Sequence, residues 1–115
     1  MPHIRISGME RQQVMHMSEA LVDQLAEVVG CPRDHFTIEL LPTEFIFDDK
    51  MDANRYPFID VQWFERGQQI QDRVAEIITD AVRNRLRGEE KELDVCVRFY
   101  PLDPFKYYEN GNHFG

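Results

Sequence analysis

The stretch HIRISGMERQQVMHMSEALVDQLAEVVGCPRDHFTIEL, residues 3–40, decides the fold, because it reads as strand, helix and strand. Residues 3–6 alternate polar and apolar side chains, which is the period of a half-buried strand. Residues 36–40 alternate in the same way, and Leu41-Pro42 ends them. Between them, apolar residues on one stripe predict an amphipathic helix, and Gly30 favours its C-terminal end. The stripe consists of Val14, Met17, Leu21, Val22, Leu25, Val28 and Val29.

The second half of the chain repeats this order of elements. Residues 59–63 alternate as a strand, residues 67–86 carry a second apolar stripe, and residues 93–99 alternate again. The two helical stretches overlay when position 12 is set on position 68, so that Gln12-Gln13-Val14 meets Gln68-Gln69-Ile70. This match predicts a duplicated βαβ unit. Right-handed crossovers then place both helices on one face of a four-stranded sheet.

The opposite face of that sheet is expected to be polar, and to meet solvent or other subunits. Its predicted members are Arg5, Thr37, Glu39, Asp60, Gln62, Asp94, Cys96 and Arg98. The join between the halves, residues 42–57, contains the apolar triplet Phe45-Ile46-Phe47. Such a triplet forms a short strand at a sheet edge or docks onto a partner. We favour docking in an oligomer.

Length and composition indicate one domain, residues 1–115, with repeat units at about 2–47 and 57–100 and a tail at 101–115. The 21 acidic and 13 basic residues give a net charge of −8, which opposes binding to nucleic acid or anionic membrane. No apolar run approaches the ~20 residues of a membrane span, and no signal peptide is visible. A cytoplasmic location is therefore expected.

No cofactor or metal is expected from the residue patterns. Cys31 and Cys96 form no CxxC pair, and the four histidines show no metal-ligand spacing. The chain also lacks a glycine-rich loop that would cradle a phosphate. Any chemistry must therefore come from the side chains and from the chain terminus.

Pro2 is the residue most directly tied to chemistry. Methionine before a small residue is normally removed after synthesis, which would leave Pro2 with a free secondary amine. An α-amino group titrates at about 8, and burial or a nearby cation lowers that pKa. The amine then becomes a usable general base near neutral pH. Because many proteins begin Met-Pro without using it, the dipeptide alone establishes no function.

A proline at position two, an immediate strand and a doubled βαβ unit together resemble the tautomerase superfamily, which includes macrophage migration inhibitory factor (MIF) and 4-oxalocrotonate tautomerase (4-OT). The resemblance implies an α+β fold with a four-stranded mixed sheet and two helices on one face. It also implies a homotrimer with the active site at the amino-terminal proline. Other stretches resemble the uncharacterised bacterial DUF1904 family: residues 1–5, 30–34, 56–58, 63–68 and 107–111.

The same resemblance implies roles for individual residues. Tautomerases often carry an arginine at the start of a βαβ helix, and Arg66 matches that place beside the catalytic amine of Pro2. An arginine there stabilises developing enolate charge. Arg33 is the cation nearest to the position at which the MIF branch places a lysine. We expect it to contact substrate.

The tail is rich in side chains that form hydrogen bonds. Tyr107, Tyr108 and Asn110 are expected to bind substrate, because hydroxyl and amide groups can donate to a carbonyl oxygen. The Asn110-Gly111 pair predicts a tight hairpin turn. The competing interpretation is that the tyrosines and Phe114 only attach the C-terminus to a neighbouring subunit.

Three classes of function stay open at this point. The first is a tautomerase-like enzyme that transfers a proton on a small carbonyl or carboxylate compound. The second is a noncatalytic oligomeric or ligand-binding protein with the same fold. The third is a ferredoxin-like ligand-binding domain, which has a different strand order. The state of the N-terminus and the surroundings of Pro2 distinguish the first two.

Overall fold

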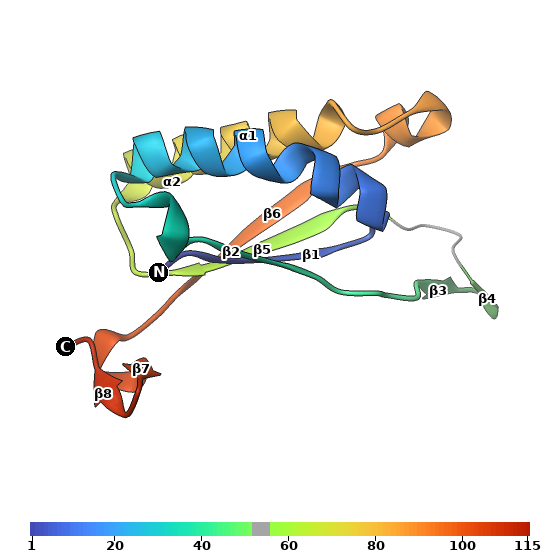
Figure 1. Cartoon of the computed structure of the whole chain (residues 1–115). Coiled ribbons are helices and arrows are strands. Elements are labelled where there is room, and N and C mark those ends of the chain that lie inside the picture. The colour runs from blue at the N-terminus through green and yellow to red at the C-terminus, as the bar shows by residue number, and fades with distance from the viewer. Residues whose placement is uncertain (52–55) are drawn as a thin grey trace.

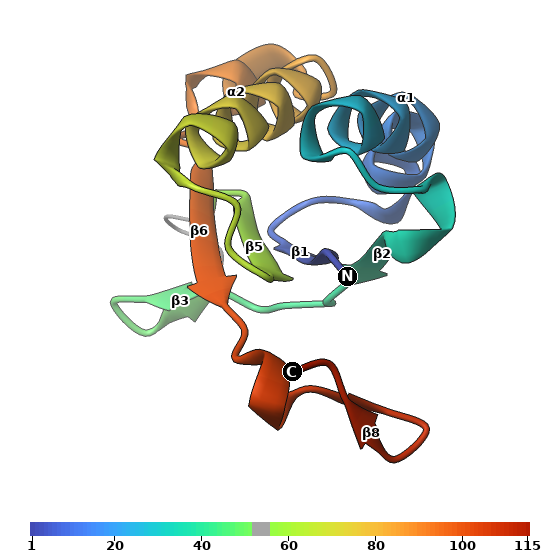
Figure 2. The same ribbon diagram turned by 90° about the vertical axis from the view of Figure 1, so that its left-hand side faces the viewer.

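The computed structural model describes residues 1–51 and 56–115, so part of the predicted join, residues 52–55, lies outside the described residues. The main body has two layers, a twisted sheet and a pair of helices that cover one of its faces (Figure 1). The two helices lie side by side and run in opposite directions (Figure 2). This is the arrangement that the sequence predicts.

The first unit follows the predicted order closely. Strand β1 (His3–Ser7) leads into helix α1 (Arg11–Val29), and the 3₁₀ turn η1 (Arg33–His35) leads into strand β2 (Thr37–Leu40). Gly30 adopts the left-handed conformation that ends α1, with its N–H bonded to the Ala26 carbonyl at 2.9 Å. Strands β1 and β2 pair in parallel.

The second unit consists of strand β5 (Phe58–Trp63), helix α2 (Gln68–Arg83), the 3₁₀ turn η2 (Gly88–Glu92) and strand β6 (Cys96–Pro101). Strand β5 pairs antiparallel with β1 and parallel with β6, which gives a mixed sheet in the order β2-β1-β5-β6. Because β1 and β2 are direct neighbours, the split βαβ arrangement of a ferredoxin-like domain is excluded.

Two predicted boundaries in the second unit are wrong. Helix α2 ends at Arg83 and not near Leu86, because the N–H groups of Arg85 and Leu86 bond three residues back and tighten the chain. Strand β6 begins at Cys96 and not at Leu93, because the Leu93 N–H closes η2. The apolar alternation before residue 96 reflects packing against the core. It does not reflect strand pairing, and Asp94 therefore lies outside the sheet.

The core lies between the helices and the sheet. Its buried members are all apolar, as the two helical stripes and the strand alternation predict. They are Ile4, Ile6, Val14, Met17, Leu21, Leu25, Ile59, Val61, Trp63, Val74, Ile77, Ile78, Val82 and Leu86. The uncovered face of the sheet carries charge pairs, including Arg98 with Asp60 at 2.7 and 3.0 Å.

Two small hairpins project from this body. Strands β3 (Ile46–Phe47) and β4 (Lys50–Met51) pair only with each other, so the apolar triplet is not an edge strand of the main sheet. Ile46 is 72% exposed, and docking onto a partner stays a prediction. After β6 come the 3₁₀ turn η3 (Pro104–Lys106), β7 (Tyr108–Glu109) and β8 (Asn112–His113).

The C-terminal hairpin is the one that the Asn-Gly pair predicts. Asn110 and Gly111 have φ angles of 52° and 84°, so both central residues of the turn are left-handed, as a type I′ turn requires. The hairpin lies beyond the end of β6, away from the helices (Figure 2). Among the described residues, no helix is long and apolar enough to cross a bilayer.

Candidate functional site

The start of the chain lies at one end of the sheet, beside β2. The ring of Pro2 is fully buried, and its carbonyl oxygen accepts a hydrogen bond from the Thr37 N–H at 3.2 Å. This bond continues the parallel pairing of β1 with β2 by one residue. The backbone at Pro2 is therefore held by the sheet, and only Met1 precedes it.

Arg66 lies in the loop between β5 and α2. Its Nη1 donates to the carbonyl oxygen of Phe64 at 2.6 Å, and its guanidinium carbon lies 5.6 Å from the ring centre of Trp63. A cation over an indole face is favourable, and this stacking fixes the plane of the guanidinium. Arginine has five N–H donors. Among the described residues, the Arg66 side chain donates only to the Phe64 carbonyl, which leaves its other N–H groups without a hydrogen-bond partner there.

The terminal amine lies within electrostatic reach of groups from three other segments. Burial is the main effect that lowers the pKa of the Met1 amine, and the positive charge of Arg66 lowers it further. Cys31 and the carboxylate of Glu109 act in the opposite direction. The Pro2 nitrogen is one residue away, and consecutive Cα atoms are about 3.8 Å apart. Removal of Met1 would therefore expose a Pro2 amine to much the same field.

The C-terminal tail reaches this site through an aromatic cluster. The ring of Tyr107 lies 5.3 Å from Phe64 and 5.1 Å from Phe114, and Phe64 and Phe114 are 5.8 Å apart. The Tyr107 hydroxyl donates to a carboxylate oxygen of Glu109 at 3.0 Å. Burial, and then this carboxylate, raise the pKa of Tyr107 above its usual range. Tyr107 is therefore a neutral donor at physiological pH.

The structure brings some of the sequence-predicted residues together and leaves others apart. Arg66 lies within electrostatic reach of the N-terminal amine, and Tyr107 packs against Phe64, two residues before Arg66. Arg33 instead forms an ion pair with Asp23 on α1 at 2.7 Å. Tyr108 is 58% exposed and packs edge-on against His113, and Asn110 forms the hairpin turn. Within one chain, the substrate contacts predicted for these last three residues find no support.

Two residues at the site were not predicted from the sequence. Glu109 is two positions after Tyr107, and residues with that spacing share one side of an extended chain. That spacing was the available signal. Cys31, a half-buried free cysteine, lies near the amine only because η1 turns the chain back toward β2. No sequence pattern indicates that proximity.

The start of the chain adjoins none of the well-defined cavities of the described residues. None of the four best-defined cavities in the described residues is lined by Pro2 or Arg66. The described residues also hold no group of three or more histidine, cysteine or carboxylate side chains placed to bind a metal. The groups that this arrangement offers for chemistry include the N-terminal amine, the Arg66 guanidinium and the Tyr107 phenol.

The fold places the chain among proteins with the MIF and 4-OT tautomerase fold. A MIF-like protein from Entamoeba histolytica superposes with a TM-score of 0.73 at 15% identity, covering 98% of each chain. A fused 4-OT, solved as an asymmetric trimer, gives a TM-score of 0.78 at 10% identity, with coverage of 96% of this chain and 94% of that one. At these identities the likeness shows the fold alone.

Comparison of the sequence with family models also identifies the family to which the chain belongs. Residues 1–113 match the model of DUF1904, a domain of unknown function, and the chain belongs to this family. A DUF1904 crystal structure from Sebaldella termitidis is 37% identical, with a TM-score of 0.89 and coverage of 99% of this chain and 100% of that one. No curated protein matches the chain.

Proposed function

We propose that this protein is a tautomerase-like enzyme that uses the amine of Pro2, freed by removal of Met1, to transfer a proton on a small carbonyl or carboxylate compound. One observation carries the proposal: the Met1 amine, one residue before Pro2, is partly buried and within electrostatic reach of Arg66, and both effects lower its pKa. A lowered pKa makes the neutral, basic form available near neutral pH.

The proposed reaction has two proton transfers. The neutral Pro2 amine takes a proton from the carbon next to the carbonyl, and the electrons of that C–H bond form the enolate. Arg66 donates to the enolate oxygen, or to a neighbouring carboxylate, where negative charge develops. The protonated amine then returns its proton to the distal carbon of the enol. The amine is neutral again, and the double bond has moved.

Tyr107 and Glu109 have supporting roles in this proposal. Because Tyr107 is neutral, its phenol can turn from Glu109 to donate to a carbonyl oxygen of the substrate. The carboxylate of Glu109 limits how far Arg66 and burial lower the pKa of the amine. An amine with too low a pKa would be a weak base, so this balance favours proton transfer in both directions.

The enzyme is proposed to act as a homotrimer. Pro2 and Arg66 line none of the well-defined cavities of one chain, the described helices cover only one face of the sheet, and the β3–β4 hairpin exposes apolar side chains. A fused 4-OT with the same fold forms an asymmetric trimer. A neighbouring subunit would close the site and cover these surfaces.

The central experiment compares two prolines that are equally buried. Pro2 and Pro57 are both fully buried, but only Pro2 can provide an amine. The natively expressed protein is first weighed intact to establish whether Met1 is removed. Enol ketonisation of a small 2-oxo acid is then measured for wild type, Pro2→Ala and Pro57→Ala.

Loss of the Met1 mass and a rate that falls about 10²–10⁴-fold in Pro2→Ala, but not in Pro57→Ala, are expected. Equal rates in wild type and Pro2→Ala would rule out a requirement for the secondary amine of proline, because the variant's N-terminal amine is primary. Retained Met1 in the native protein would leave Pro2 as an amide, and the noncatalytic alternative would then hold.

A further inference from the structure

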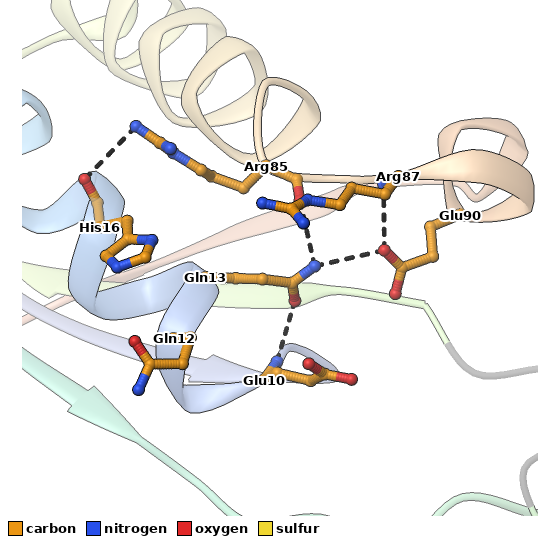
Figure 3. Close-up of a pocket in the computed structure, with 7 residues that line it drawn as sticks. All are labelled: Glu10, Gln12, Gln13, His16, Arg85, Arg87 and Glu90. Carbon is orange, nitrogen blue, oxygen red and sulfur yellow. Dashed lines mark hydrogen bonds between the residues drawn. The ribbon is translucent and has the colours of Figure 1, made fainter.

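A polar cavity lies at the other end of β1 from Pro2, between the start of α1 and the segment that follows α2 (Figure 3). It has a volume of about 280 Å³. The five residues of β1, at roughly 3.3 Å each, separate it from Pro2 by roughly 15 Å. The cavity is therefore independent of the site proposed above.

Gln13 builds the floor of this cavity by joining three segments. Its side-chain oxygen accepts from the Glu10 N–H at 2.9 Å. Its side-chain nitrogen donates to the carbonyl oxygen of Arg85 at 3.1 Å and to the carboxylate of Glu90 at 3.2 Å. These bonds hold the cavity in shape without a ligand, so binding would cost little conformational entropy.

The acidic residues of the cavity, Glu90 and Glu10, take part in hydrogen bonds within the protein. The carboxylate oxygen of Glu90 that binds Gln13 also accepts from the Arg87 N–H at 3.0 Å. Glu10 forms a capping box with Gln13 at the start of α1. Both residues therefore take part in chain-end hydrogen bonding, and because their carboxylates keep a negative charge, an anion is favoured only on the arginine side of the cavity.

The basic side chains, by contrast, retain most of their donors. Arg85 makes one long hydrogen bond, 3.4 Å from Nη2 to the carbonyl oxygen of His16. For the guanidinium of Arg87, the described residues provide no hydrogen-bond acceptor. Figure 3 shows both arginine side chains extending back toward α1, with the imidazole of His16 across the cavity. The guanidinium groups of Arg85 and Arg87 thus present N–H donors to a cavity that is large enough for a small molecule.

We propose that this cavity binds a small oxyanion, a carboxylate or a phosphate, through Arg87 and Arg85, with His16 as an additional donor. Guanidinium groups match the paired oxygens of both anions and form charge-assisted bonds with them. Because the chain as a whole carries a net charge of −8, attraction of an anion is confined to the immediate surroundings of these arginines. Only a compact anion that fits between the two arginines gains from it.

The test is a titration followed by ¹⁵N–¹H spectra of the full chain. Inorganic phosphate and succinate are added separately, so that the two arms distinguish a phosphate site from a carboxylate site. For the preferred anion, we expect saturable shifts of the Gln13, His16 and Arg87 amides, with a dissociation constant on the order of 1 mM. Because Arg87 is exposed, Arg87→Ala should keep the fold.

Matched variants locate the site. Arg87→Ala is expected to weaken binding about tenfold or more, and Arg87→Lys less, because lysine keeps the charge but loses the fork. Arg73→Ala removes an exposed arginine of α2 that pairs with Glu76, and it should bind like wild type. Equal binding by Arg87→Ala and Arg73→Ala, shifts centred on Arg66, or no saturable shift with either anion would overturn the proposal.

Discussion

At the scale of single residues, two charges of opposite sign act on the chain terminus. Arg66 is held by the Phe64 carbonyl and the Trp63 ring, and Glu109 is held by the Tyr107 hydroxyl. Neither charge is close to the terminus in sequence. Their combined effect, added to burial, decides how much of the amine is neutral at a given pH.

This balance predicts opposite shifts for two variants. Arg66→Gln removes a cation that lowers the pKa of the amine, so that pKa should rise toward its ordinary value. Glu109→Gln removes an anion that raises it, so the pKa should fall further. The pH titration of the N-terminal amine, followed by NMR in wild type and both variants, measures the shifts directly.

The same directions of pKa shift are expected in the pH dependence of the proposed reaction. The active form is the neutral amine, so the rate should rise with pH through the pKa of the amine. This rising limb should move to higher pH in Arg66→Gln and to lower pH in Glu109→Gln. Shifts in the same direction for both variants would contradict the electrostatic assignment. Arg73→Gln, which changes a distant charge, is the control.

At the scale of elements, the turn between β1 and α1 depends on a close approach. Gly8 has a φ angle of 80°, and a Cβ at this position would overlap the carbonyl oxygen of Tyr56, just before β5. The turn from the first unit therefore touches the entry of the second. A side chain at position 8 would push apart the two strands at the centre of the sheet.

We expect Gly8→Ala to destabilise the protein by about 2–4 kcal/mol, because it adds a backbone clash to an unfavourable φ angle. Gly30→Ala is the matched control. Gly30 has a similar φ of 77° but open space around its Cα, so only the conformational cost of about 1 kcal/mol applies. Urea unfolding of the three proteins gives both values, and equal losses would refute the clash.

At the scale of the whole molecule, the uncovered sheet face and the β3–β4 hairpin are the surfaces that a trimer would bury. The hairpin exposes Ile46, Phe47 and Met51, and it projects from the body where it cannot contribute to the core (Figure 1). Exposed apolar groups at one place favour association. The proposed trimer therefore depends on the hairpin more than on the helices.

Light scattering after size exclusion should give three times the chain mass for wild type. Ile46→Asp should lower this mass toward that of one chain, because a charge would be buried in the interface. Met15→Asp is the control, because Met15 is 58% exposed but belongs to α1 and not to the hairpin. A monomeric wild type, or equal effects of both variants, would refute the trimer or the role of the hairpin.

The amino-acid sequence by itself determined the order of the elements, the two helical stripes and the turn at Asn110-Gly111. These features follow from local periodicity and backbone preference, which a single stretch of chain contains. The duplicated pattern was also enough to predict both helices on one face. It did not determine where α2 ends or where β6 begins, because packing of Leu86 and closure of η2 decide those positions.

Only the tertiary structure decided which residues lie within electrostatic reach of the N-terminal amine. Arg66 follows β5, Cys31 precedes β2 and Glu109 belongs to the tail, so their proximity depends on strand order and on aromatic packing around Phe64. The same holds for Gln13 and Arg87 at the polar cavity beside the start of α1. Electrostatic effects act through space, and chain connectivity alone does not specify the distances that control them.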